Sequence, residues 1–300
     1  MITPAGFAQV LLFGIANGCV YILLATGLNL IFGVMKLVNF AHGQLLMVGA
    51  FVAYETTKIA GLNPYASILV SIGSVALIGI ALEKFAFRRV RGTEKLNEIF
   101  ISLGLIYVFE NVATLLWEPN RDIQINSPLR GLSLSLGEVT LSYDRIFAVV
   151  IVVVILVGLI LLTKKTKIGL AMRATSQKSD ASMLMGININ KVYLFTFAVG
   201  AALAGAAGAL YGILFPFNPA LGALPTIKGF AIIILGGLGS IPGAVIGGLL
   251  YGIAENSTAY ILNDPSVLGS SGSWPDAIAF VLLIVVLIVR PTGIFGEKGE

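Results

Sequence analysis

The chain has 300 residues, of which 57% are hydrophobic and only 11% are charged, with a net charge of +4. Ordinary globular domains have about 25% charged residues, and disordered chains are rich in charge and poor in apolar residues. The composition therefore excludes a water-soluble domain and a disordered chain, and it predicts an integral membrane protein.

Seven apolar stretches are long enough for membrane helices, which need about 20 residues. An eighth apolar region, 222–262, is too long for one helix and is interrupted by a Gly-rich run at 236–243, so we predict two short spans or a broken pair there. The predicted fold class is all-α, a polytopic transmembrane helical bundle of eight to nine spans with Gly- and Pro-broken helices. The seven stretches lie near 7–33, 35–56, 64–83, 98–117, 145–163, 192–214 and 274–290.

Basic residues gather in three segments, 84–95, 164–191 and the stretch after residue 289, which hold 13 of the 19 lysines and arginines. The positive-inside rule places such segments in the cytoplasm. We therefore expect the N-terminus outside and the C-terminus inside. An odd number of spans satisfies this orientation, so nine fits better than eight. The net charge follows from the topology and gives no reason to expect nucleic acid as a partner.

Two loops exceed the length of a turn. In the outside loop, 118–144, polar and apolar residues alternate on both sides of Gly137, which predicts a β-hairpin. This loop either covers helix ends or receives an external protein. The inside loop, 163–191, begins basic and continues with apolar residues up to Gly186, which predicts a short helix. That helix either lies on anionic lipid or docks a protein, and its residue spacing leaves both readings open.

Four polar positions fall within apolar stretches, where charged groups are costly and usually face the bundle interior or a cavity. His42, the only histidine, lies near the start of the second span and either lines a pathway or makes a hydrogen bond between helices. Glu110 and Glu255 are candidates for buried polar groups, although Glu255 also fits a boundary position near the outer surface. Lys228 and Glu255 flank the Gly-rich run.

Two interrupted segments, 33–43 and 236–243, lie in the two halves of the chain. Irregular backbone at membrane depth is tolerated only where it is buried in protein or lines a cavity, and paired interruptions of this kind point to the binding site of transporters. We therefore predict that both segments line a translocation path. Its predicted residues are Asn39, Phe40, His42, Gly43 and Gln44 from the first segment and Gly236, Gly237, Gly239 and Ser240 from the second.

The chain carries no motif that predicts an enzyme. It has no phosphate-binding loop and no Gly-x-Ser-x-Gly nucleophile elbow. One histidine, one cysteine and no paired carboxylates at helical spacing give no basis for a metal site. We expect no cofactor and no catalytic residue, and any ATP that drives this protein must be hydrolysed by another chain.

Several motifs, taken together and in order, resemble the branched-chain amino-acid ABC transporter permeases, and in particular the smaller of the two permease types. The similarity covers nearly the whole chain. The motifs are Gly27–Gln44 continuing to Gly49–Phe51, Gly169–Ala174 with Asp180-Ala181 and Gly186–Ile189, Gly200–Gly208, Ile234–Gly248 and Arg290–Gly296.

The resemblance implies a single permease domain over 1–300 in the bacterial inner membrane, which carries leucine, isoleucine and valine by alternating access. It implies a second permease subunit, two cytoplasmic ATP-binding subunits and a periplasmic solute-binding protein. The 163–191 segment would couple to the ATPase, and the 118–144 loop would help receive the binding protein. The implied coupling residues are Gly169, Arg173, Asp180, Ala181 and Gly186.

Three alternatives stay open. Permeases for urea, amides or other amino acids share these motifs. A secondary transporter driven by an ion gradient would depend on Glu110 or Glu255, and a membrane scaffold would show no substrate effect. The coupling-type segment favours the ABC transporter over the secondary transporter and the scaffold.

Overall fold

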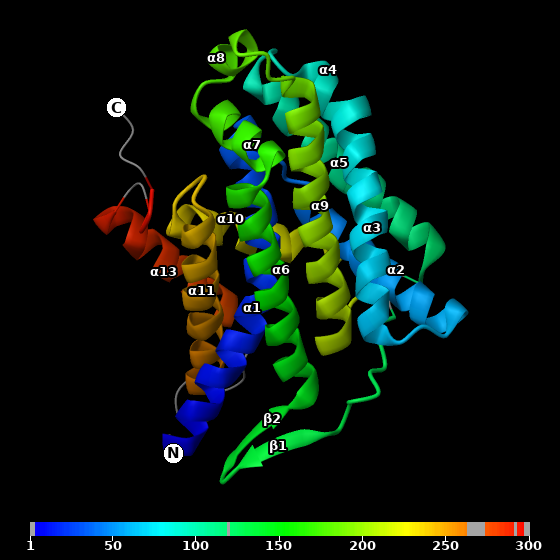
Figure 1. Cartoon of the computed structure of the whole chain (residues 1–300). Helices are drawn as coiled ribbons and strands as arrows, with labels where there is room; N and C mark the ends of the chain where they lie inside the picture. The colour runs from blue at the N-terminus through cyan, green and yellow to red at the C-terminus, as the bar shows by residue number, and fades with distance from the viewer. Residues whose placement is uncertain (1–3, 119–120, 263–273, 291–292, 297–300) are drawn as a thin grey trace.

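The computed structural model describes residues 4–118, 121–262, 274–290 and 293–296. Within these residues the chain is a bundle of helices with one small hairpin (Figure 1), which confirms the all-α, polytopic class. In chain order the elements are α1 Pro4–Met35, α2 His42–Ala60, α3 Pro64–Leu82, the π-helical turn η1 Glu83–Phe87, α4 Arg88–Val90, α5 Lys95–Leu116, β1 Ser133–Leu136, β2 Val139–Ser142, α6 Tyr143–Lys165, α7 Lys167–Gln177, α8 Ser179–Leu184, α9 Ile189–Leu214, α10 Ala223–Gly236, α11 Ile241–Leu262 and α13 Trp274–Val289.

Five described helical segments are long and apolar enough to cross a membrane, and they contain α1, α3, α5, α6 and α9. Helices α10 and α11 pass the same test together but are bent by 117° at their junction. This confirms the broken pair expected within 222–262. Helices α2 and α13 have 19 and 16 residues, and the count of eight to nine spans stays a prediction.

Helix α9 lies at the centre of the bundle, because 72% of the residues in its most apolar stretch are buried, against 11% for α5. Small residues allow this close packing. The Ser71 hydroxyl of α3 lies 2.9 Å from the carbonyl oxygens of both Gly49 in α2 and Gly205 in α9. A Cβ added to Gly205 would lie 2.9 Å from the Ser71 carbonyl oxygen. Three helices therefore meet at backbone distance, as is typical of membrane bundles.

The predicted hairpin is present. Strands β1 and β2 pair antiparallel from Ser133 with Ser142 to Leu136 with Val139, and Gly137 takes the positive φ of 67° that the tight turn needs. The rest of the loop is tied to the helices through Ile123, which exchanges hydrogen bonds of 2.9 and 2.8 Å with Phe217. We call this the hairpin end of the bundle, and α1 begins here (Figure 1).

Helices α4, α7 and α8 gather at the opposite end, which we call the basic end (Figure 1). The segment expected to form one short helix forms two, α7 and α8, because the chain is extended at Lys178, with φ −148° and ψ 105°. Gly186 follows α8 with a φ of 82°, as expected for a glycine just past a helix end.

Candidate functional site

The first interrupted segment leaves a stretch of extended chain inside the bundle. Helix α1 ends at Met35, Lys36 has a φ of 55°, and α2 begins only at His42. The span expected near 35–56 therefore starts later than predicted, because Asn39 turns the chain at this point. Its side-chain oxygen accepts a hydrogen bond of 3.0 Å from the Ala41 N–H.

Helix α2 begins well below the basic end. A Cβ added to Gly27 of α1 would lie 3.0 Å from Nε2 of His42. Since Gly27 precedes the end of α1 at Met35 by two helical turns, the start of α2 lies about 12 Å below that end. Helix α2 therefore starts inside the bundle rather than at its basic end.

The start of α2 meets the start of α10. The Gly43 N–H donates to Oγ1 of Thr226 at 3.1 Å, and the amide of Gln44 lies directly against Gly222. Beside this contact the rings of Phe40 and Phe230 lie 4.8 Å apart. The structure thus brings the N-termini of two helices together, although their residues are about 180 positions apart in the sequence. We call residues 39–44 and 222–226 the junction.

Polar atoms in the junction are buried without partners among the described residues. Both amide atoms of Gln44 and Nδ2 of Asn39 have no hydrogen bond, and both residues have 0% exposure. An unpaired buried polar group costs about 1–3 kcal/mol. Native proteins usually keep such groups only where function requires them. Asn39, Phe40, His42, Gly43 and Gln44 were predicted together, and the structure places all five here.

The second interrupted segment is built differently. Gly237 and Gly239 have φ values of 107° and 86°, and Asn29 of α1 holds both sides of the turn. The Gly239 N–H donates to Oδ1 of Asn29 at 2.6 Å, and Nδ2 of Asn29 donates to the Ser240 carbonyl oxygen at 2.6 Å. Oγ of Ser240 in turn accepts from the Gly243 N–H at 3.1 Å, at the start of α11.

The chain end completes this second segment. The N–H groups of Ile294 and Phe295 donate to the carbonyl oxygens of Leu235 and Gly236 at 2.9 and 3.0 Å. These bonds satisfy carbonyls that the last turn of a helix otherwise leaves unpaired. We call residues 236–243 with 293–296 the Gly-rich turn.

The two predicted halves of the path meet only at one edge. A Cβ added to Gly33 would lie 3.2 Å from the Cα of Gly239. The other predicted residues lie at opposite ends of α10, because Thr226 and Gly236 are ten residues apart, about 15 Å along a helix. Helix α10 therefore separates residues 39–44 from Gly236–Ser240, and the prediction that both groups line one path stays a prediction.

A charged pair lies in α10 and α11 between these regions. Nζ of Lys228 donates to Oε1 of Glu255 at 2.6 Å and to the hydroxyl of Tyr21 in α1 at 3.3 Å. The two charged side chains are only 9% and 15% exposed. The sequence allowed two positions for Glu255, one inside the bundle and one at the outer boundary, and the side chain takes the interior one. Its pairing with Lys228, 27 residues away, was not predicted.

Glu110 does not belong to the buried set. Helix α5 has only two fully buried residues, Ser102 and Ala113, and Glu110 is partly exposed on it. Helix α5 packs at the edge of the bundle, and a role for Glu110 as a buried polar group stays a prediction.

The predicted coupling residues lie on a segment whose inner face is anchored. Met172 and Thr175 of α7 are buried, and the Gly169 N–H donates to Oγ1 of Thr166 at 3.1 Å. The remaining four predicted residues, Arg173, Asp180, Ala181 and Gly186, are all exposed. The end of α8 adds a strongly exposed apolar group that we call the α8 tip. It consists of Met183, Leu184 and Met185, which are 53%, 90% and 83% exposed.

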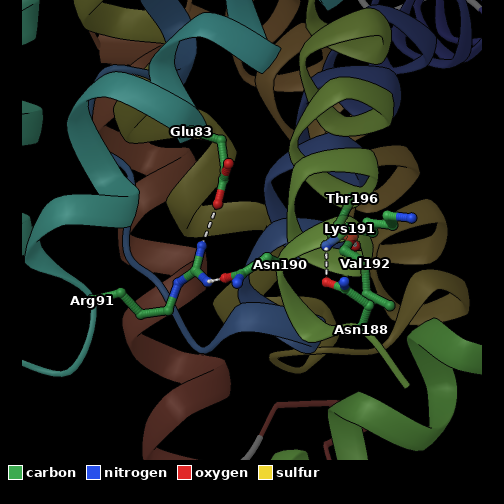
Figure 2. Close-up of polar contacts among 7 residues, drawn as sticks. All are labelled: Glu83, Arg91, Asn188, Asn190, Lys191, Val192 and Thr196. Atoms are coloured by element: carbon green, nitrogen blue, oxygen red, sulfur yellow. Dashed lines mark hydrogen bonds and ion pairs between the residues drawn. The ribbon is translucent and has the colours of Figure 1, made fainter. Parts of the chain in front are cut away.

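A second buried ion pair stabilises the basic end, and sequence reasoning missed it. Arg91 pairs with Glu83, which has 0% exposure, and Nη1 of Arg91 donates to Oδ1 of Asn190 at 3.0 Å (Figure 2). The guanidinium carbon lies 4.3 Å from the centre of the Tyr193 ring. This contact joins α4 to the first turn of α9. The sequence does contain one sign of this ion pair: a glutamate at the end of an apolar stretch, followed eight residues later by an arginine.

Comparisons with known proteins support one family over the whole length. Residues 10–287 match the family model described as branched-chain amino acid transport system / permease component. The chain belongs to that family.

Two relatives are identical to this branched-chain permease at about a third of the aligned positions. It is 34% identical to the high-affinity branched-chain amino acid transport system permease protein BraD of Pseudomonas aeruginosa, over 97% of this chain and 96% of BraD. It is also 34% identical to the protein of the same description, LivH, of Escherichia coli K12, with the same two coverages. The similarity to LivM of the same strain is lower, at 25% over 92% of this chain and 67% of LivM.

Proposed function

We propose that this chain is the membrane-spanning permease subunit of an ATP-binding-cassette importer that carries leucine, isoleucine and valine. The family supplies the substrate class. The single structural observation that carries the importer mechanism is the α8 tip, an exposed apolar group on a segment that is otherwise anchored to the bundle. Monomeric soluble surfaces rarely keep contiguous apolar residues in water without a partner.

The occupant of the α8 tip is the cytoplasmic ATPase subunit rather than the lipid surface. Interfacial helices that bind anionic lipid are rich in lysine and arginine, whereas no basic residue occurs between positions 179 and 190. Asp180 adds a negative charge beside the tip, and Arg173 lies exposed on α7. These two side chains give polar contacts around the apolar centre, and Gly169, Ala181 and Gly186 allow close approach.

The other partners follow from this placement. The basic end faces the cytoplasm, so the N-terminus lies outside, the C-terminus lies inside, and the hairpin end receives the solute-binding protein. Two ATPase subunits bind two permeases, of which this chain is one. The protein lies in the inner membrane as a single permease domain, and its exposed aliphatic residues on α5 and α6 face lipid or the second permease.

Transport proceeds by alternating access. Closure of the ATPase dimer moves the coupling segments, and the path between the two permeases opens to one side at a time. We place this path along residues 39–44. The second predicted group, Gly236–Ser240, lies beside the end of this path that opens toward the basic end, and Gly239 is exposed there.

Purification and reconstitution of the complex test this function. The tagged chain, extracted gently, should bring two ATPase subunits and a second permease, and the reconstituted complex with its binding protein should take up leucine when ATP is supplied. Arg173→Glu should weaken ATPase association, whereas Arg121→Glu, at an exposed basic residue of the hairpin end, should not. A lone chain that transports leucine without an ATPase would contradict the proposal.

A further inference from the structure

The junction has the features of a site for a carboxylate, and it has no assigned ligand. Two helices, α2 and α10, start there, and the backbone dipoles of a helix give its N-terminus a partial positive charge. In transporters, the N-termini of discontinuous helices point at the anionic group of the substrate. A helix start alone does not make a site, so the side chains around it decide.

The side chains around the two helix starts are donors without partners. Nε2 of Gln44 and Nδ2 of Asn39 are fully buried and make no hydrogen bond with any described residue. The Gln44 amide lies against Gly222, so it points at the start of α10. The Thr226 hydroxyl has partners in this form: it accepts from the Gly43 N–H at 3.1 Å and donates to the Gly222 carbonyl oxygen at 2.7 Å.

The charges nearby favour an anion that comes and goes. The carboxylate of Glu255 lies at Lys228, where an ion pair of 2.6 Å already compensates it. Asn39, Gln44 and Thr226 are neutral, and His42, whose buried ring nitrogens have no hydrogen-bond partner among the described residues, is the one titratable side chain of the junction. Such a site can bind a carboxylate and release it again, because no permanent positive charge holds it there. Reversible binding of this kind is what a transported substrate needs.

We propose that the junction binds the α-carboxylate of the amino acid during its passage, and that this structure shows the junction closed. The inference rests on the proposed function, because it takes the substrate class from there. In the closed form Gly43 and Gly222 let the two helix starts touch. Opening separates them and turns the donors of Asn39 and Gln44 toward the path, with the aliphatic side chain of the substrate beside Phe40 and Phe230.

Variants of Gln44 test the proposal in the reconstituted complex. Gln44→Glu places a carboxylate in the junction and should lower leucine uptake at least tenfold by repulsion. Gln44→Leu removes the donor and should lower uptake similarly, while the midpoint of thermal unfolding stays unchanged or rises. It should not fall, because an unpaired amide is replaced by an apolar group. Thr226→Val should act in the same direction on uptake.

Thr196→Val is the matched control, because Thr196 is a fully buried threonine whose hydroxyl bonds only its own helix, to the Val192 carbonyl oxygen at 2.8 Å. Its uptake should be unchanged. Normal uptake by both Gln44 variants would overturn the carboxylate site and leave the proposed function standing. A Gln44→Leu protein that loses stability and uptake together would also overturn it, since that result marks a structural role. An unchanged complex that takes up no amino acid would remove the proposed function and this site with it.

Discussion

The two interrupted segments look alike in sequence but differ in how their polar groups are satisfied. In the Gly-rich turn, Asn29, Ser240 and the backbone of 293–296 pair the exposed donors and carbonyls. In the junction, the amide of Gln44 and Nδ2 of Asn39 stay unpaired although they are fully buried. Glycine is common to both breaks, whereas the unpaired buried polar groups distinguish the junction, where we propose a ligand.

The difference assigns different roles to the two regions. The Gly-rich turn fixes the 117° bend between α10 and α11 and connects it to α1. The junction holds two helix starts together, where we propose that the substrate carboxylate binds. Predictions that separate these roles concern stability at the first region and transport at the second.

The largest effect on stability is expected from the ion pair between the two regions. Lys228→Met leaves the carboxylate of Glu255 buried beside Tyr21, and an uncompensated buried charge costs about 3–5 kcal/mol. The double variant Lys228→Met/Glu255→Leu removes both charges and should recover most of the loss. Thermal unfolding of the purified protein in detergent measures both. If the double variant is no more stable than Lys228→Met, the uncompensated charge of Glu255 is not the cause of the lost stability.

A smaller loss is expected from the Gly-rich turn. Asn29→Leu removes the bonds to Gly239 and Ser240, and we expect a destabilisation of about 1–3 kcal/mol from the groups left unpaired. Uptake per assembled complex should stay within about twofold of the unchanged protein. A variant with full stability and no transport would place the Gly-rich turn on the substrate path and reverse the comparison.

The smallest effect on stability is expected at the basic end. Leu184→Asp should change the free energy of unfolding by less than about 0.5 kcal/mol, because this side chain is 90% exposed. Co-purification of the ATPase should nevertheless fall several-fold, since a charge enters the apolar tip. Leu132→Asp, at an exposed leucine beside the hairpin at the other end of the bundle, is the control. Equal ATPase recovery from both variants would move the docking surface away from α8.

Much of the fold could be predicted from the sequence because helix spans, the hairpin and the broken pair are local patterns. The alternation around Gly137 was sufficient for the hairpin, and the Gly-rich run was sufficient for the bend. The start of the second span was less predictable, because four of the six residues 36–41 are apolar and continue the apolar stretch of α1. Only the neighbours of Asn39 show that the chain is extended there.

The partners of individual residues could not be predicted. Asn29 lies within a long apolar stretch, and its contacts with Gly239 and Ser240 span about 210 positions. Thr226 gave no sign in the sequence that it would contact Gly43. Arg91 fitted the positive-inside pattern, which concealed its pairing with Glu83. In each case the contact depends on how deep each residue lies along the membrane normal. Hydropathy predicts that depth only to within several residues.

The most direct test of the central claim measures leucine uptake per assembled complex and the thermal midpoint for Gln44→Leu and Asn29→Leu side by side. We predict opposite outcomes for the two variants. Gln44→Leu should be as stable as the unchanged protein and at least tenfold slower in uptake, whereas Asn29→Leu should be less stable and nearly normal in uptake. If stability and uptake fall together in both variants, or if Asn29→Leu alone loses uptake at full stability, the assignment of transport to the junction and of structure to the Gly-rich turn is contradicted.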